Sequence, residues 1–213
     1  AGADVVILPG TKNTIEDLLG IRRSGMADAV LRHARAGGLV IGVCGGYQML
    51  GARLRDPLGV ESGVPEARGL GLLDMEVEFL PQKTTAQARG EIRCPRGWLS
   101  ALNGLALDGY EIHSGVSRLG VDAAPFLYAR GEVCGAVNKD GNVLGAYLHG
   151  LFDSGELWRA VVNRVRRQKG LAALAGPAPR RDQLRERELD RLARAVRESL
   201  DMDAVYRILR GEG

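Results

Sequence analysis

The sequence predicts an α/β protein with a doubly wound, mostly parallel β-sheet flanked by helices. Two short runs, DVVIL at residues 4–8 and LVIGV at residues 39–43, have the continuous apolar and β-branched character of strands buried on both faces of a parallel sheet. The residues between them have helical patterns, which parallel neighbours need as a crossover. A chain of 213 residues is long enough for one such domain with a helical appendage.

Two helices are predicted between these strands. Thr14 and Asp17 match a capping box that opens the first helix. In the second, apolar residues from Ala27 to Ala34 recur at the spacing of one helix face, and Gly37 ends the pattern. After the second strand, GGYQMLGA is typical of the first turns of a third helix.

The second half of the chain is rich in strands and then becomes helical. Residues 69–147 contain six strand-like segments separated by glycines and by the turn signal KDGN, and a helix follows over residues 156–169. The breaker run GPAP at residues 176–179 marks a boundary. We therefore expect a domain over residues 1–175 and a helical tail over residues 176–213. The tail has one apolar face, which we expect to pack on the domain, with a partner as the alternative.

Composition and charge favour a soluble globular protein. Hydrophobic residues make up 45% of the chain and charged residues 26%, without a secretory signal or an apolar stretch near the roughly 20 residues of a membrane span. The net charge is +3 with acidic and basic residues interspersed, so we expect no nucleic-acid or membrane partner. The three cysteines lie far apart with no CxxC pair, which disfavours a metal site or a disulfide framework and favours a reducing cytoplasm. Because the chain enters a strand almost at once, we expect it to be a segment of something longer.

One cysteine has the setting of a nucleophile. Cys44 lies at the corner between LVIGV and the third helix, with Gly42 and Gly46 on either side. A helix N-terminus lowers a thiol pKa, and the thiolate is the nucleophilic form. A buried structural cysteine in a glycine-rich turn gives the same pattern, so the motif alone leaves both roles open. Cys94 and Cys134 lie in strand-like segments and are expected to be small apolar fillers.

A cysteine nucleophile needs an acid/base partner and donors for an oxyanion. His149 ends the strand LGAYL, so it should emerge at the carboxyl edge of the sheet beside the Cys44 corner. His113 in GYEIHSG is the competing candidate. The backbone N–H groups of Gly45 and Gly10 are natural oxyanion donors, although Gly10 also suits a simple strand-end turn.

As a set, these motifs resemble the class I (triad-type) glutamine amidotransferases, in the branch of the cobyrinic and cobyric acid synthases. The matching stretches are ADVVILPGTKNT, GLVIGVCGGYQMLG, GYEIHSG, LGAYLHGLFD and DRLARAVRESLD, and GYEIH with YLHGLFD is most similar to the cobyric acid synthase family. The resemblance implies a flavodoxin-like fold in which Cys44 attacks glutamine and His149 transfers protons. It also implies Gly10 and Gly45 as oxyanion donors and places Gln48 near the bound glutamine.

The chain departs from ordinary triad amidotransferases at one position. They carry a carboxylate two residues after the histidine, where this sequence has Leu151, a feature shared by the branch that it resembles. Such a carboxylate would orient the imidazole and stabilise its charged form. Glu111 and Asp153 are the candidates for a group that holds His149 instead.

The resemblance implies the C-terminal glutaminase half of a ligase that amidates corrin carboxylates in cobalamin biosynthesis. The chain has no GxxxxGK[ST] loop, so we expect ATP, Mg²⁺ and the corrinoid to bind an N-terminal synthetase domain and no cofactor to bind here. Nearby alternatives are the glutaminase part of cobyrinic acid a,c-diamide synthase or of a cell-wall amidotransferase. More distant ones are a cysteine hydrolase and a non-catalytic docking module of the same fold.

Overall fold

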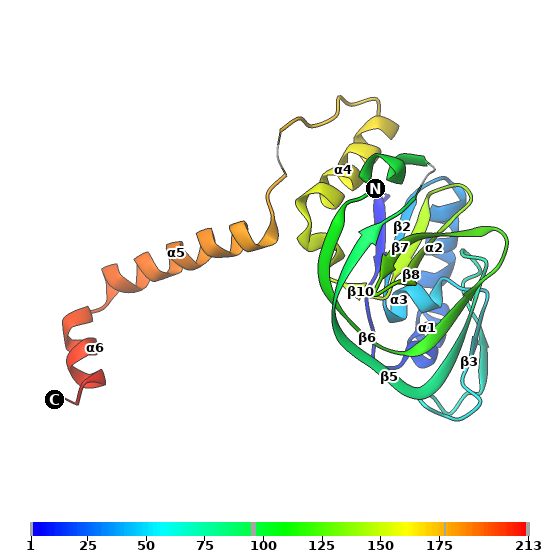
Figure 1. Cartoon of the computed structure of the whole chain (residues 1–213), viewed down its shortest axis with the longest axis horizontal. Helices are drawn as coiled ribbons and strands as arrows, with labels where there is room; N and C mark the ends of the chain where they lie inside the picture. Colours follow the sequence, from blue (N-terminus) through cyan, green and yellow to red (C-terminus); the bar gives the residue numbers. More distant parts are fainter. Residues whose placement is uncertain (1, 95–96, 177, 212–213) are drawn as a thin grey trace.

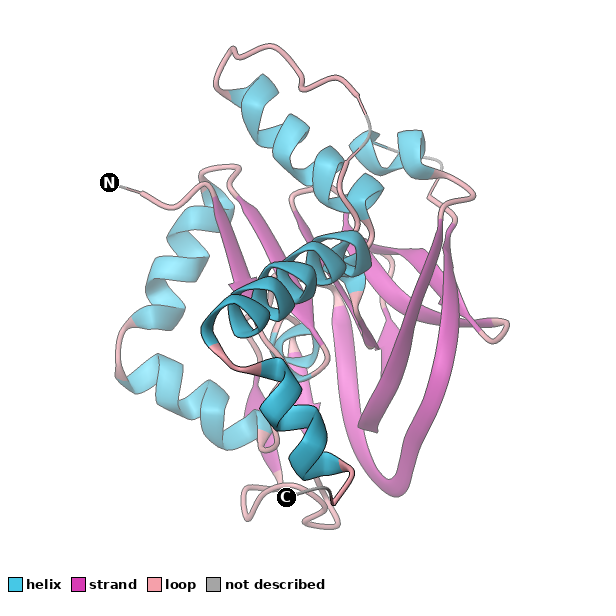
Figure 2. Cartoon of the chain, turned by 90° about the vertical axis from the view of Figure 1, so that its left-hand side faces the viewer, coloured by secondary structure: helices cyan, strands magenta, loops and turns pink. Residues whose placement is uncertain are grey.

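The structure, a computed structural model, describes residues 2–94, 97–176 and 178–211. It is built around a ten-stranded sheet with helices on both sides, and two further helices extend away from this body (Figures 1 and 2). The strands are β1 (Val5–Leu8), β2 (Leu39–Val43), β3 (Arg53–Arg55), β4 (Glu66–Arg68), β5 (Met75–Ile92), β6 (Ala106–Leu119), β7 (Ala123–Ala129), β8 (Glu132–Asn138), β9 (Val143–Ala146) and β10 (Leu148–His149). The helices are α1 (Thr14–Arg23), α2 (Met26–Arg35), α3 (Gly45–Met49), α4 (Gly155–Gln168), α5 (Arg181–Ser199) and α6 (Met202–Leu209), with short 3₁₀ turns η1 (Gly97–Leu102) and η2 (Leu151–Asp153).

The strand order is β1-β2-β9-β8-β7-β5-β3-β4, and β6 pairs with both β5 and β10. The predicted α/β class, with helices flanking the sheet, is confirmed. Parallel pairing joins β1 to β2, β2 to β9 and β3 to β5. The other pairs are antiparallel. Short turns connect β7 to β8 and, through KDGN, β8 to β9, and a short turn permits only antiparallel pairing.

Two hydrophobic clusters cover the two faces of the parallel strands. In β2, Val40 belongs to the cluster beneath α1 and α2, whereas Leu39 and Ile41 belong to a second cluster with Leu157 and Val161 of α4. Successive residues of a strand point to opposite faces, so this alternation places α1 and α2 opposite α4. The continuous apolar run of β2 follows from its burial on both faces.

The first helix begins differently from the prediction. Asn13 caps α1, its side chain accepting a hydrogen bond from the backbone N–H of Glu16 at 3.2 Å, and Thr14 is the first helical residue. The Thr14 hydroxyl instead donates to Oε1 of Gln48 at 3.0 Å. A tertiary contact with α3 has therefore replaced the local capping bond predicted for this side chain.

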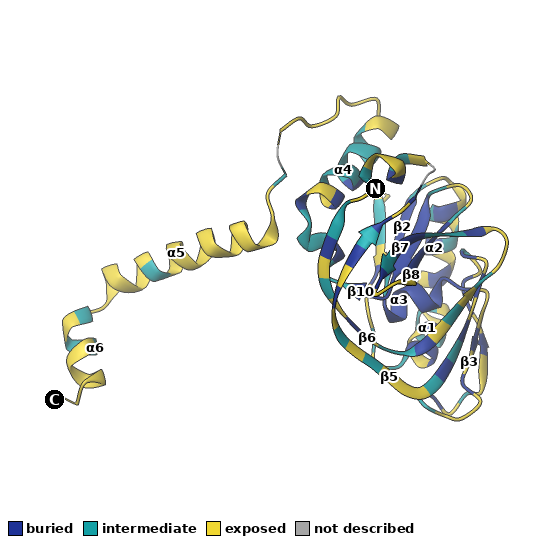
Figure 3. Cartoon of the chain, in the orientation of Figure 1, coloured by how far each residue is buried: buried dark blue, intermediate teal, exposed yellow. Residues whose placement is uncertain are grey.

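The helical tail does not pack on the domain as expected. Neither α5 nor α6 contributes a buried residue, and both extend away from the sheet (Figure 3). Arg181, at the start of α5, pairs with Asp153 at 2.9 Å. The apolar face of the tail lines a shallow groove between α5 and α6, so part of this face is used within the tail itself. In the described ranges, no helix combines the length and the apolar character needed to cross a membrane.

The close contact between α3 and β1 leads to a stability prediction. A Cβ added at Gly46 would lie 2.1 Å from the carbonyl oxygen of Leu8, so β1 and α3 would have to separate. We expect Gly46→Ala to lower the free energy of unfolding by about 2 kcal/mol or more, measured by urea denaturation. Gly20→Ala is the matched control because its Cβ would lie 3.9 Å from the nearest atom and alanine favours a helix interior. Equal stability of the two variants would contradict this account.

Candidate active site

Cys44 occupies a strained corner between β2 and α3. Its φ of 51° and ψ of −112° are unusual for a side chain with a Cβ, and only Arg130 shares a positive φ among the described non-glycine residues. Its N–H donates to the carbonyl of Ala146 at 2.8 Å, and its carbonyl accepts from the N–H of Gln48 at 3.0 Å. Backbone strain that the surroundings hold in this way is common at functional sites.

The thiol of Cys44 is buried and held in its neutral form. Its Sγ donates to the carbonyl oxygen of Ile112 on β6 at 3.3 Å, and the residue is 7% exposed. Burial raises the pKa of the Cys44 thiol, outweighing the opposing effect of the Gly45 backbone N–H. The predicted lowering of this pKa is wrong, because the cost of burying the charged form exceeds the effect of the backbone N–H at the start of α3. The resting thiol therefore needs a base before it can act as a nucleophile.

His149 and Cys44 both lie next to Gly10, on the side where a side chain at position 10 would be. A Cβ built on Gly10 would be 3.3 Å from Cε1 of His149 and 3.5 Å from Cβ of Cys44. The ring of His149 stacks on Tyr110, with centroids 4.7 Å apart. Its Nε2 is buried without a hydrogen-bond partner in the described structure, and burial lowers the pKa of His149. A neutral imidazole with a free buried nitrogen can accept a proton from a nearby thiol.

His113, the competing candidate, is engaged elsewhere. Its Nδ1 lies 2.9 Å from the carbonyl of Gly115, and its ring stacks on Tyr147 with centroids 3.8 Å apart. Burial lowers the pKa of His113 as well. These contacts give His113 a packing role, whereas the position beside Gly10 and Cys44 belongs to His149.

Neither candidate carboxylate holds His149 in this structure. Glu111 is buried and pairs with Arg130 at 2.8 Å, and burial together with the Glu111 carboxylate raises the pKa of Cys134 to about 12. Asp153 pairs with Arg181. Pairing of β10 with β6 and the stack on Tyr110 position the imidazole instead. The high pKa of Cys134 makes it an unreactive thiol at neutral pH.

Gln48 and Gly45 lie in the same small region as Cys44. Gln48 is buried. Its Oε1 accepts a hydrogen bond from the Thr14 hydroxyl, and its Nε2 donates to the hydroxyl of Tyr147 at 3.4 Å. A Cβ on Gly45 would be 2.4 Å from Cγ2 of Thr11, so the two segments predicted to supply oxyanion donors lie side by side.

The sequence patterns do not reveal the supporting residues of this region. The pattern around Thr14 indicates only a helix cap, and no pattern indicates a role for Tyr147. Tyr147 lies in a bend between β9 and β10, which breaks the two-residue alternation that could have related it to His149. Ser117, whose Oγ lies 2.7 Å from the Tyr147 hydroxyl, also carried no sequence signal.

Similar folds occur among solved glutamine amidotransferases. A structure described as a glutamine amidotransferase aligns with a TM-score of 0.55 and 20% identity, over 79% of this chain and 80% of that chain. PurLQS from Thermotoga maritima aligns with a TM-score of 0.57 and 16% identity, over 76% of this chain and 80% of that chain. At these identities the likeness concerns the fold alone, which is that of the class I glutamine amidotransferases.

Sequence relatives define the family more narrowly. The chain belongs to the CobB/CobQ-like glutamine amidotransferase domain family, whose sequence model matches residues 1–157. Cobyric acid synthases of Photorhabdus laumondii and Citrobacter koseri are 45% and 46% identical to it over 216 and 214 residues. Each alignment covers 98% of this chain but 42% of the relative, so the chain spans less than half the length of these proteins. The resemblance to the cobyric acid synthase family is confirmed.

Burial of the thiol predicts how fast Cys44 reacts at different pH values. Only the thiolate is alkylated, and the pKa of Cys44 lies above the ordinary thiol range. We expect labelling of Cys44 by iodoacetamide to rise roughly tenfold per pH unit between about pH 6.5 and 8.5. Peptide mass mapping measures the extent of labelling at Cys44, and the Cys44→Ser variant is the control. A rate that levels off below pH 7 would show a depressed pKa instead.

Proposed function

We propose that this chain is the glutaminase domain of a cobyric acid synthase, which releases ammonia from glutamine for the amidation of corrin carboxylates. The observation that carries the proposal is the meeting of Cys44, His149 and Gly10 at the carboxyl ends of neighbouring strands. Ligands of open α/β sheets bind at this edge. The cobyric acid synthase relatives, aligned over nearly the whole chain, supply the substrate class.

The first half-reaction begins from two neutral groups. The imidazole of His149 takes the proton of the Cys44 thiol, and the thiolate attacks the side-chain amide carbon of glutamine. The carbonyl oxygen becomes an oxyanion, which accepts hydrogen bonds from the backbone N–H groups of Gly10 and Gly45. As the tetrahedral intermediate collapses, His149 returns the proton to the departing nitrogen. Ammonia leaves, and a glutamyl thioester remains on Cys44.

The second half-reaction restores the enzyme. His149 takes a proton from a water molecule, whose oxygen attacks the thioester carbonyl carbon. Collapse of this second intermediate breaks the carbon–sulfur bond and releases glutamate, and the proton held by His149 returns to the Cys44 sulfur. The imidazole thus cycles between neutral and charged forms in each half-reaction. Its lowered pKa favours the neutral form with which both steps begin.

Ammonia alone does not amidate a carboxylate, which must first be activated. In the proposed enzyme, ATP with Mg²⁺ activates the corrin carboxylate on an N-terminal synthetase domain. Two observations support a separate location for this step. The chain has no phosphate-binding GxxxxGK[ST] motif, and it covers only 42% of the length of the cobyric acid synthase from Photorhabdus laumondii. Glutamine and the synthetase domain with its corrinoid substrate are therefore the partners of this chain.

Substitution of the two reacting groups tests the proposal in the complete enzyme. We expect Cys44→Ser and His149→Asn each to lower glutamine-dependent amidation by roughly a thousandfold or more. Amidation driven by added ammonium salts should remain, because it bypasses both residues. His113→Asn serves as the matched histidine control and should lose far less of the glutamine-dependent rate. Product formation by mass spectrometry measures all three variants.

Covalent labelling separates the proposal from its alternatives. A chloroketone analogue of glutamine should modify Cys44 and not Cys134, and excess glutamine should slow the modification. A cysteine peptidase would not require a glutamine-like probe. If Cys44→Ser retained full glutamine-dependent amidation, the domain would be a docking module and the proposed function would be wrong.

A further inference from the structure

His149 transfers protons in both half-reactions of the proposed mechanism, yet no carboxylate in the described structure holds its ring. Both candidate carboxylates, Glu111 and Asp153, pair with arginines instead. An imidazole that is free to turn about its side-chain bonds loses the geometry needed for proton transfer, and a small misplacement of a reacting group can slow a reaction about a hundredfold. Another contact must therefore fix the plane of this ring.

Tyr110 provides such a contact from β6. Its ring lies parallel to the imidazole of His149, with 1° between the two planes and 4.7 Å between the centroids. Parallel rings at this separation are offset-stacked, which is one of the arrangements that aromatic pairs prefer. Because the tyrosine ring covers one face of the imidazole, rotation about the last side-chain bond of His149 would make the two rings collide. The stack thus restricts the imidazole to one plane.

The backbone of Tyr110 is fixed by the strands on both sides of β6. Tyr110 pairs with His149 of β10 and with Gln87 of β5. Residues directly opposite each other in antiparallel strands have Cβ atoms about 5 Å apart, so the register itself brings the two rings together. The strands are so close here that a Cβ on Gly109 would collide with the carbonyl oxygen of His149. Tyr110 therefore has a fixed position although the residue is 42% exposed.

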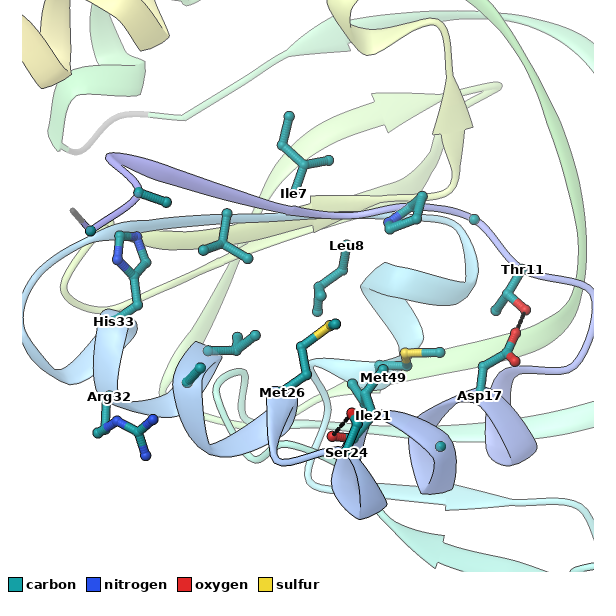
Figure 4. Close-up of a pocket in the computed structure, with 18 residues that line it drawn as sticks. Ile7, Leu8, Thr11, Asp17, Ile21, Ser24, Met26, Arg32, His33 and Met49 are labelled. Atoms are coloured by element: carbon teal, nitrogen blue, oxygen red, sulfur yellow. Dashed lines mark hydrogen bonds between the residues drawn. The ribbon is translucent and has the colours of Figure 1, made fainter.

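The loop that faces the imidazole is fixed as well. Figure 4 shows the hydroxyl of Thr11 donating to the carboxylate of Asp17 on α1, beside the apolar groove along β1. The same hydroxyl accepts a hydrogen bond from the N–H of Asn13 at 3.2 Å. The neighbouring residue is Gly10, whose Cβ position would lie 3.3 Å from Cε1 of His149. With this loop held, the stack on Tyr110 determines how the imidazole is aligned with its surroundings.

The ring of Tyr110 makes this contact, and its hydroxyl does not. Within the residues that the structure describes, the Tyr110 hydroxyl has no hydrogen-bond partner. The face of an aromatic ring attracts a cation as well as a neutral ring, so the stack holds His149 in both protonation states that the mechanism uses. A carboxylate partner would instead raise the pKa of the imidazole, whereas burial lowers the pKa of His149 here.

We propose that Tyr110 is the positioning residue of His149 and takes the orienting role of the carboxylate that ordinary triad amidotransferases carry where this chain has Leu151. This role rests on the proposed function, because it requires His149 to transfer protons. Tyr110 acts through the imidazole, so its effect belongs to the rate of the chemical steps and not to the binding of glutamine.

Two substitutions in the complete enzyme separate the ring from the hydroxyl, with glutamate release from glutamine as the measurement. Tyr110→Phe keeps the stack, and we expect kcat within about twofold of the wild-type value. Tyr110→Leu removes the stack, and we expect kcat to fall at least about tenfold while KM for glutamine stays unchanged. Tyr128→Leu is the matched control and should retain the wild-type kcat, because the ring of Tyr128 faces Arg93.

Either of two kinetic results would overturn the role of Tyr110. One is a wild-type kcat in Tyr110→Leu. The other is an equal fall of kcat in Tyr110→Phe and Tyr110→Leu, since it would assign the effect to the hydroxyl. Amidation driven by added ammonium salts should persist in every variant, which checks that the rest of the enzyme is intact.

A spectroscopic measurement tests the stack without relying on activity. In the NMR spectrum of this chain, at least one carbon-bound ring proton of His149 should be shifted upfield by the ring current of Tyr110. The shift should persist in Tyr110→Phe and be lost in Tyr110→Leu, and the His149→Asn variant assigns the signal. Absence of an upfield shift in the wild-type chain would contradict the stack and the role built on it.

Failure of the Tyr110 role differs from failure of the glutaminase. Full glutamine-dependent amidation by Cys44→Ser would reject the glutaminase, and the role of Tyr110 would fall with it. An inactive Cys44→Ser together with a wild-type kcat in Tyr110→Leu would reject only the role of Tyr110.

Discussion

The site depends on the close backbone contact between the end of β1 and the start of α3. Gly46 lies so near the carbonyl of Leu8 that no Cβ fits between them, and this contact fixes the corner at which Cys44 adopts its positive φ. Parallel pairing of β1 with β2 then brings the Gly10 loop to the same edge. The positions of the Cys44 corner and the Gly10 loop therefore follow from backbone contacts and sheet pairing rather than from contacts between the side chains of the site.

Burial gives both reacting groups a neutral resting form. The thiol lies against a carbonyl oxygen of β6, and the imidazole is enclosed by Tyr110 and the sheet. A thiolate and imidazolium pair would be desolvated here at considerable cost. In the proposed mechanism, the reactive charges should therefore form when the bound amide and the proposed oxyanion donors share them.

Local patterns predicted the parts of the structure that depend on local sequence. The apolar runs of β1 and β2 and the placement of Cys44 and His149 at strand ends follow from composition and order along the chain. The raised pKa of Cys44 did not follow, because it comes from burial, and the elements that bury the thiol include β6, whose Ile112 is 68 residues away. The segments LLDMEVEF and AQARGEIRC also join into one strand, β5, since β6 pairs along nearly its whole length. The sequence also did not reveal that Glu111 pairs with Arg130 and Asp153 with Arg181, which leaves neither carboxylate as the group that holds His149.

Gly10 has a consequence for comparing members of this family. A residue larger than glycine at position 10 would place its side chain between Cys44 and His149. A homologous chain could thus keep both its cysteine and its histidine and still have no room for an amide between them. Distinguishing active from silent domains by sequence therefore requires the residue in the loop after the first strand to be checked together with the two reactive ones.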